Sequence, residues 1–246
     1  MNKKELMSCI LTTAFKNKEG HIASAFSILD FMLSLYNGVI TNDDEFILSK
    51  GHSSLALYAI MLAKKQISIE DFFLFCEFDS KLGGHPSSKK LPNVKISTGS
   101  LGHGFPYAVG VAMAKKMKKE KGIVYCLIGD GEANEGTIWE SALLAGSQKL
   151  DNLVCVMDFN GSGERAIKLV SCVEKFRSFF WNSIAVDGHK ESEIKNSLLF
   201  KSNIPKFIEL RTIKGKGCPI MENNPEWHHK QPSSEQELST LIESLY

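Results

Sequence analysis

Two polar motifs follow continuous apolar segments, and their residue types suit the binding of a metal ion and a diphosphate. Gly129-Asp130-Gly131 closes the apolar segment 123–129, and Asp158-Phe159-Asn160 closes the segment 153–158. A carboxylate and an amide oxygen can together hold Mg²⁺, because phosphate oxygens and water complete the octahedral shell of this ion. Glycine backbone amides and a nearby helix N-terminus can take a diphosphate. The two motifs therefore indicate a site for a Mg²⁺-diphosphate group.

Other interpretations of these motifs are open. Asp130 and Asn160 can make ordinary turns at strand ends, because Asp-Gly and Asn-Gly are favoured turn dipeptides. A calcium loop that starts at Asp130 fails, because its sixth position is Glu135 instead of Gly and its twelfth is Ser141 instead of Glu.

A dinucleotide-binding turn is a stronger rival. Residues 161–166 (GSGERA) follow a predicted strand and fit the pattern Gly-x-Gly-x-x-Ala, and Asp187 lies at a later strand end. Alone the motif is weak, because residues 164–172 make only an ambiguous helix and the turn at Asp130 is left without a role. This alternative predicts NAD binding that needs no Mg²⁺.

The segments around these motifs predict parallel strands joined by helices. Continuous apolar and β-branched runs, which suit parallel strands covered on both faces, occupy residues 123–129, 153–158, 183–187 and 206–212. Apolar positions on a helical period predict helices over 22–36 and 52–65, and residues 135–150 make a helix between the first two strands. The crossover of this βαβ unit should be right-handed. Both polar strand ends then lie at the ligand-binding edge of the sheet.

The composition indicates one globular domain over residues 1–246, with 43% hydrophobic and 23% charged residues. We expect a three-layer α/β sandwich with a mostly parallel sheet. The lysines at 115–121 interleave with helix formers instead of aromatic residues, which argues against nucleic-acid binding. No run approaches the roughly 18 apolar residues of a membrane span, and no secretory segment is evident, so we expect a cytoplasmic protein. The six cysteines form no Cys-x-x-Cys pair and are expected to be reduced structural thiols.

The turns of the chain resemble those of the transketolase family, whose cofactor signature begins with Gly-Asp-Gly and closes about thirty residues later at an Asn. The resemblance extends from about Gly20 to His229, in the order of the family. It is carried by five segments: 50–54 (KGHSS), 84–86 (GHP), 97–104 (STGSLGHG), 129–136 (GDGEANEG) and 214–217 (KGKG).

The resemblance implies thiamine diphosphate and Mg²⁺ as cofactors, bound by a domain of the diphosphate-binding type. Asp130, Asn160 and the backbone carbonyl of Ser162 would hold the metal. The implied cofactor contacts are His52, Gly99, Ser100, Leu101, Gly129, Asp130, Gly131, Glu132 and Asn160.

Four histidines and one glutamate match catalytic positions of the family. His21, His85, His103 and His228 would transfer protons to and from sugar hydroxyls, a task that suits imidazole near neutral pH. Glu135 matches the acidic residue at the subunit interface near the aminopyrimidine. A structural histidine is the alternative for any one of them, whereas their places on matching turns favour the catalytic role.

Two departures from the family shape the expectation. Single-chain transketolases are more than twice as long, and the part beyond Tyr246 supplies the pyrimidine-binding and C-terminal domains. The chain thus resembles the first subunit of two-subunit transketolases, and we expect a partner chain with those domains in a heterotetramer of two copies of each. After Asn160, residues 161–165 are small and polar and the path to Trp181 is short. Arg165 on this path could meet an anionic substrate or stay solvated.

The resemblance predicts the transfer of a two-carbon ketol unit from a ketose, or its phosphate, to an aldose. A transketolase for an unusual sugar would explain the altered segment after Asn160. A deoxyxylulose-phosphate synthase-like enzyme or a 2-oxoacid decarboxylating subunit would share the metal site. A binding subunit without turnover is the non-enzymatic alternative.

Overall fold

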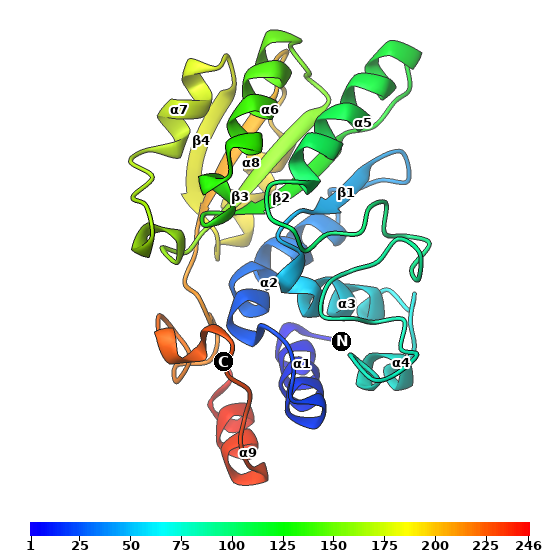
Figure 1. Ribbon diagram of the computed structural model, residues 1–246, viewed down its shortest axis with the longest axis vertical. Coiled ribbons are helices and arrows are strands. Elements are labelled where there is room, and N and C mark those ends of the chain that lie inside the picture. The colour runs from blue at the N-terminus through cyan, green and yellow to red at the C-terminus, as the bar shows by residue number, and fades with distance from the viewer. The chain divides into compact units, whose positions relative to one another are not determined.

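A computed structural model describes residues 1–246 (Figure 1). The chain divides into two compact units. The sheet unit consists of Ser34–Lys50 and Thr98–Thr212, and the helical unit consists of Met1–Leu33, Gly51–Ser97 and Ile213–Tyr246.

The sheet unit contains five strands in the order β1-β2-β3-β5-β4, and every pairing is parallel. β2 is buried along its whole length, and β3 along all but its last residue, which explains their continuous apolar sequences. The strands are β1 (Glu45–Leu48), β2 (Val124–Gly129), β3 (Leu153–Phe159), β4 (Asn182–Asp187) and β5 (Lys206–Arg211). The predicted parallel α/β sheet is confirmed, and β1 is a strand that the sequence analysis did not predict.

Helices cover both faces of this sheet. The sheet unit has α5 (Gly104–Lys118), α6 (Gly136–Ser147), α7 (Cys172–Ser178) and α8 (Glu191–Leu199). Parallel crossovers are right-handed, so the step back from β4 to β5 places α8 on the face opposite α6 and α7. Figure 1 shows α6 and α7 in front of the sheet and α8 behind it. The three-layer arrangement is therefore as predicted.

Close packing fixes α6, the helix that follows the Gly129-Asp130-Gly131 turn. Gly146 lies so near the Phe179 carbonyl that a Cβ atom at this position would be 1.7 Å from its oxygen. The Trp181 indole donates a hydrogen bond to the Ala142 carbonyl (2.8 Å). The end of α6 is thereby attached to the segment before β4.

The helical unit is built from helices whose starts are set by local sequence. Asn2 and Glu5 form a capping box at the start of α1, and Ser68 and Asp71 form one at α4. Its elements are α1 (Lys3–Asn17), α2 (Ile22–Tyr36, whose last three residues belong to the sheet unit), η1 (Gly51–Ser53), α3 (Ser54–Ala63), α4 (Ile69–Phe73), η4 (Pro225–His228) and α9 (Glu235–Ser244). The helices predicted over 22–36 and 52–65 are confirmed, the second beginning with a 3₁₀ turn.

None of the helices combines the length and the apolar character that crossing a membrane requires.

Candidate functional site

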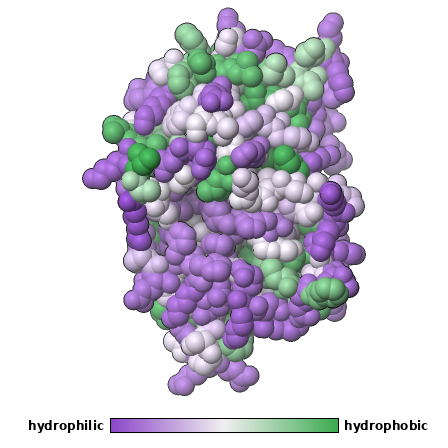
Figure 2. Space-filling view, in the orientation of Figure 1, coloured by the Kyte–Doolittle hydropathy of each residue, from purple (hydrophilic) through white to green (hydrophobic).

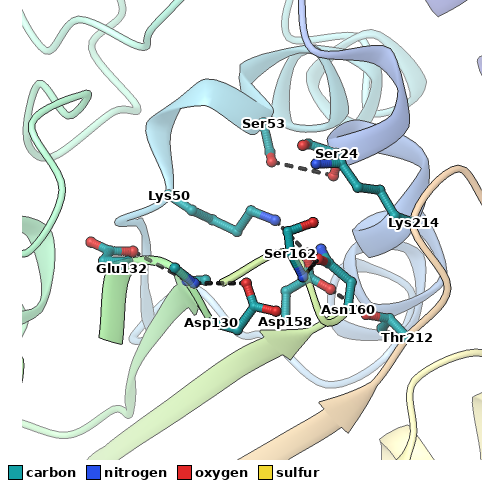
Figure 3. Close-up of polar contacts among 12 residues, drawn as sticks. Ser24, Lys50, Ser53, Asp130, Glu132, Asp158, Asn160, Ser162, Thr212 and Lys214 are labelled. Atoms are coloured by element: carbon teal, nitrogen blue, oxygen red, sulfur yellow. Dashed lines mark hydrogen bonds and ion pairs between the residues drawn. The ribbon is translucent and has the colours of Figure 1, made fainter. Parts of the chain in front are cut away.

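The carboxyl ends of four adjacent strands carry polar residues at one edge of the sheet unit. Lys50 follows β1, Asp130 follows β2, Asp158 lies near the end of β3, and Thr212 follows β5. Parallel pairing brings these ends together, because all the strands run in the same direction. Figure 3 shows the residues as one polar group.

Asp158 is the centre of this group. It is fully buried, and its carboxylate accepts hydrogen bonds from the Lys50 ammonium and the Thr212 hydroxyl. Lys50 is itself only 1% exposed, so the two residues form a buried ion pair. A buried charge needs such compensation, since leaving it unpaired costs on the order of several kcal/mol.

The Asn160 amide is oriented from both sides. Its nitrogen donates to Asp158 Oδ2 (2.9 Å), and its oxygen accepts from the Ser162 N–H (3.1 Å). These partners fix which end of the amide is oxygen. The oxygen has a second lone pair, so it can also serve as a metal ligand.

Asp130 has a different environment from Asp158. One oxygen accepts from the Gly131 N–H (2.7 Å), whereas Oδ2 is buried and has no hydrogen-bond partner. Burial, followed by repulsion from Asp158, raises the pKa of Asp130. A buried carboxylate oxygen without a donor is costly, and a bound cation would both satisfy it and favour the ionised form.

The residues present fit a magnesium site with few protein ligands. The chain provides one carboxylate oxygen, the Asn160 amide oxygen and the backbone at Ser162 within the same sheet unit. Nowhere do three His, Cys, Asp or Glu side chains come together in a way that could hold a metal ion. The oxygen donors suit Mg²⁺ with phosphate and water as its other ligands.

Glu132 holds the turn that contains Gly99, Ser100 and Leu101. It is 1% exposed and accepts from the Ser49 hydroxyl (2.5 Å), the Gly102 N–H (2.9 Å) and the Gly129 N–H (3.2 Å). Burial raises the pKa of Glu132, although these hydrogen bonds oppose the change. Both of its oxygens are used by the protein, an arrangement that suits a positioning role.

The turn at residues 98–103 has further attachments. Thr98 donates to the Leu48 carbonyl (2.8 Å), and Thr137 donates to the Gly102 carbonyl (2.8 Å). His103 is exposed, with Nδ1 3.0 Å from the Leu101 carbonyl oxygen. Glu135 is also exposed, directly before α6. The turn therefore belongs to the same unit as Asp130 and is held by β1, Glu132 and α6.

Four of the predicted histidines lie in the helical unit. The His21 ring is 5.3 Å from the His52 ring and 6.3 Å from the His228 ring, between centroids. His85 is exposed, and its charge contributes to lowering the pKa of His21. Ser53 donates to the Ser24 carbonyl (3.2 Å), as Figure 3 shows, and this bond attaches the turn of His52 to α2.

Several polar partners were not predicted from the sequence. Lys50 and Lys214 lie in motifs that carried the resemblance, but their partners Asp158 and His228 (2.9 Å from Lys214 Nζ) were not identified. A charged residue directly after a short apolar segment was the only signal for Lys50. Thr212 and the contact of Glu19 with His229 gave no signal, because each depends on a residue far away in the sequence.

The segment after Asn160 does not have the structure of a dinucleotide-binding turn. Residues 163–165 form a short 3₁₀ turn, η3 (Gly163–Arg165), and no helix begins before Cys172. The dinucleotide motif needs a helix that opens at the glycine turn. Gly163 instead allows close approach, since a Cβ atom there would be 2.5 Å from the Gly131 nitrogen. Arg165 is exposed.

Comparison with known proteins gives a family match over nearly the whole chain. Residues 12–245 match the family described as transketolase, thiamine diphosphate binding domain. One of the two subunits of an apulose-4-phosphate transketolase from Phocaeicola vulgatus is 36% identical, over 99% of this chain and 93% of the relative. A 6-deoxy-6-sulfo-D-fructose transketolase subunit from Clostridium sp. is 32% identical, over 91% and 88%.

Among solved structures, transketolase from Campylobacter jejuni superimposes with a TM-score of 0.87 at 28% identity. The match covers 99% of this chain but 43% of that one. The chain therefore spans less than half the length of this transketolase.

Proposed function

The chain belongs to the transketolase family, and from this premise we propose that it is the cofactor-binding subunit of a two-subunit transketolase. The observation that carries the proposal is the buried Asp130 oxygen without a hydrogen-bond partner, in the same polar group as the oriented Asn160 amide. Such an oxygen is accounted for by a cation that accompanies the diphosphate of the cofactor.

In this proposal Asp130, Asn160 and the Ser162 carbonyl hold Mg²⁺. The backbone at Gly129, Gly131 and the 99–101 turn contacts thiamine diphosphate, and Glu132 keeps that turn in place. When bound, thiamine diphosphate supplies the electron sink for breaking and forming the carbon–carbon bond of the ketol unit.

We assign the proton transfers to the histidines that match the family pattern. His21, His85, His103 and His228 exchange protons with sugar hydroxyls, and His52 contributes to cofactor binding. Burial, followed by the charges of His229 and His228, lowers the pKa of His21 to about 4. His21 is therefore neutral near pH 7 and can both donate and accept a hydrogen bond.

The proposal requires a partner chain with the pyrimidine-binding and C-terminal domains. Residues 1–246 would then form one cofactor-binding domain, in a heterotetramer of two copies of each chain; a cytoplasmic location stays a prediction. The sheet unit offers apolar surface for this contact, since Leu143 and Leu144 on α6 are 52% and 44% exposed. Figure 2 shows hydrophobic side chains on the face where Figure 1 places α6. Exposed apolar surface of this kind marks interaction sites.

The sugar is proposed to be a specialised ketose with an anionic group. Two relatives that match most of this chain are named for apulose 4-phosphate and for a sulfonated fructose, and both are transketolase subunits. Activity assays with a panel of phosphorylated and sulfonated ketoses would identify the donor. Equal turnover of ordinary pentose and hexose phosphates would argue for a general transketolase.

The test is calorimetric titration with thiamine diphosphate, with and without Mg²⁺, in the presence of the subunit encoded next to this chain. Wild-type protein should bind only with Mg²⁺. Asp130→Ala and Asn160→Ala should weaken binding by more than about 100-fold, since the loss of a group that only supports a ligand already costs about 10- to 100-fold.

Asp187→Ala is the matched control, because Asp187 is also an aspartate at the carboxyl end of a strand in this sheet. It should bind the cofactor as wild type does. No binding to wild-type protein under any of these conditions would overturn the enzymatic proposal. Binding of NAD that is lost in the Asp187 variant would instead revive the dinucleotide alternative.

A further inference from the structure

Two segments of the helical unit, residues 19–21 and 228–231, are bound together although they are far apart in the sequence. Glu19 Oε1 lies 2.9 Å from His229 Nε2. The Gln231 amide donates to the Gly20 carbonyl (3.0 Å). These two side-chain bonds attach the turn before α2 to the segment that follows η4.

The turn itself has little freedom. Gly20 has a φ of 116°, and a Cβ atom there would lie 2.5 Å from Leu55 Cδ1, so no other residue fits without strain. The Gly20 N–H donates to Glu19 Oε1 (2.9 Å), and the His21 carbonyl accepts from the Ala25 N–H (3.0 Å). The backbone of His21 is therefore fixed on both sides.

His229 provides the closest ring contact of His21. The two ring centroids are 4.4 Å apart and the planes are tilted by 47°, compared with centroid distances of 5.3 Å for His52 and 6.3 Å for His228. One ring nitrogen of His229 faces the Glu19 carboxylate, while the ring packs on His21. The carboxylate thus fixes the ring that fixes the His21 side chain.

We propose that Glu19 and His229 are a positioning pair for His21, which hold its imidazole in one orientation for proton transfer with the sugar. The inference rests on the proposed function, because the role of His21 comes from it. Glu19 and His229 act through His21 and do not themselves react.

The charges around His21 support this role. The titratable and charged groups that face it are Glu19, His52, His85, His228 and His229, and Lys214 contacts His228. Burial and the charges of His229 and His228 lower the pKa of His21, whereas Glu19 opposes them. Hydrogen bonds from the Gly20 N–H and His229 outweigh partial burial and lower the pKa of Glu19, so its carboxylate is ionised.

A contribution to folding does not explain the pair. The side chains of His229 and Glu19 are 50% and 40% exposed, and ion pairs at such positions contribute little to stability. Substitutions at either residue should therefore leave the fold intact, and circular dichroism and thermal unfolding would verify this.

The first measurement is an NMR pH titration of the histidine ring signals in the full chain, which needs no substrate and no cofactor. In His229→Ala the covering ring and its charge are lost, so the pKa of His21 should move from about 4 toward its ordinary value of 6.5. His189→Ala, outside the cluster, should leave the His21 titration unchanged.

The second measurement is turnover by the complex with its partner. Glu19→Ala and His229→Ala should lower kcat by about 10- to 100-fold, since a small misplacement of a reacting group can cost up to about 100-fold. Cofactor affinity should stay the same. Glu19→Gln keeps an oxygen that can accept from His229 and Gly20, so it should recover much of the lost kcat.

The outcomes separate this inference from the proposed function. Unchanged His21 titration and unchanged kcat in the His229 variant of an active enzyme would overturn the inference and leave the proposed function intact. Wild-type protein without cofactor binding or turnover would overturn the proposed function, while the NMR titration would still decide whether His229 positions His21.

Discussion

Two aspartates at the same edge of the sheet have opposite surroundings. Asp158 is paired with Lys50 and hydrogen-bonded to Thr212 and Asn160, whereas Asp130 Oδ2 has no donor. Asp158 therefore neutralises a buried charge and orients the Asn160 amide. Asp130 alone has an oxygen available for a ligand.

Removing Asp158 should be strongly destabilising. Asp158→Ala leaves the Lys50 ammonium buried without its partner, and such losses cost about 3–5 kcal/mol in the free energy of unfolding. Urea unfolding would measure this. The double variant with Lys50→Met should recover part of the loss, because no charge is then left buried.

Asp151 is the control for Asp158, because its ion pair with Lys116 (2.8 Å) is exposed. Asp151→Ala should cost less than about 1 kcal/mol. A similarly small effect for Asp158→Ala would mean that the buried pair is hydrated and does not support the site.

Asp130→Asn should raise the melting temperature of the ligand-free chain. Burial and repulsion from Asp158 raise the pKa of Asp130, so the ionised carboxylate is unfavourable near pH 7 and a neutral amide removes the repulsion. The same change should abolish Mg²⁺-dependent cofactor binding. Such an exchange of stability for function is expected of a ligand site, and a lower melting temperature would show that Asp130 is structural.

At this scale the sequence predicted the residues that follow strands and missed those that depend on distant partners. Asp130 and Asn160 could be brought together because strand direction places both at one edge. The contacts of Lys50 with Asp158 and of Glu19 with His229 span 108 and 210 residues. Only the tertiary structure determines such pairs.

Secondary-structure elements were predicted well where their pattern was long. The segment 22–36 agrees with α2, and the apolar runs at 123–129 and 153–158 agree with β2 and β3. β1 has only four residues, and pairing with β2 gives it the form of a strand. Propensity alone is too weak to define so short a segment.

Two glycines on neighbouring helices should respond oppositely to alanine. Gly146 on α6 contacts the Phe179 carbonyl, so Gly146→Ala should destabilise the protein by about 1–3 kcal/mol or more through overpacking. Gly110 on α5 has nothing within 4 Å of a Cβ position. Gly110→Ala should stabilise by about 0.4–1 kcal/mol.

Chemical unfolding of the full chain would compare these two variants. Stabilisation by both would show that the segment around Phe179 moves to accept a methyl group, and that α6 is held less firmly than the contact indicates.

For the whole molecule, the class of the fold follows from the parallel strand pattern, whereas the division into two compact units does not. No linker, repeat or change of composition marks that division in the sequence. Each unit is built from segments separated in the chain, so contacts define it. We keep one cofactor-binding domain over 1–246 as the functional prediction.

The stability of the chain should depend on pH through His21. The folded pKa of His21 is about 4 and its ordinary value is 6.5, so the unfolded chain binds more protons between these values. This contribution is constant above about pH 6.5 and is lost as the pH falls toward 4. Acids with raised pKa values, such as Glu209, act in the opposite sense.

Comparison with His21→Asn isolates this effect, because those acids are the same in both proteins. Between pH 7 and pH 5 the wild-type chain should lose more stability in urea unfolding than the variant does. Equal losses would mean that His21 titrates normally in the folded protein.

Assembly with the partner depends, in our proposal, on the apolar surface of α6. Leu143 and Leu144 are exposed on this helix, which begins directly after Glu135, the residue assigned to the subunit interface. Leu143→Lys and Leu144→Lys should each weaken the complex by about tenfold or more, since a buried interface residue that matters costs more than about 1 kcal/mol. Leu199→Lys is the control, because Leu199 is 60% exposed on α8, on the opposite face of the sheet. Sedimentation with the purified partner would separate the cases: loss of the complex in the α6 variants alone identifies α6 as the interface, and equal assembly of all three variants would place the partner elsewhere.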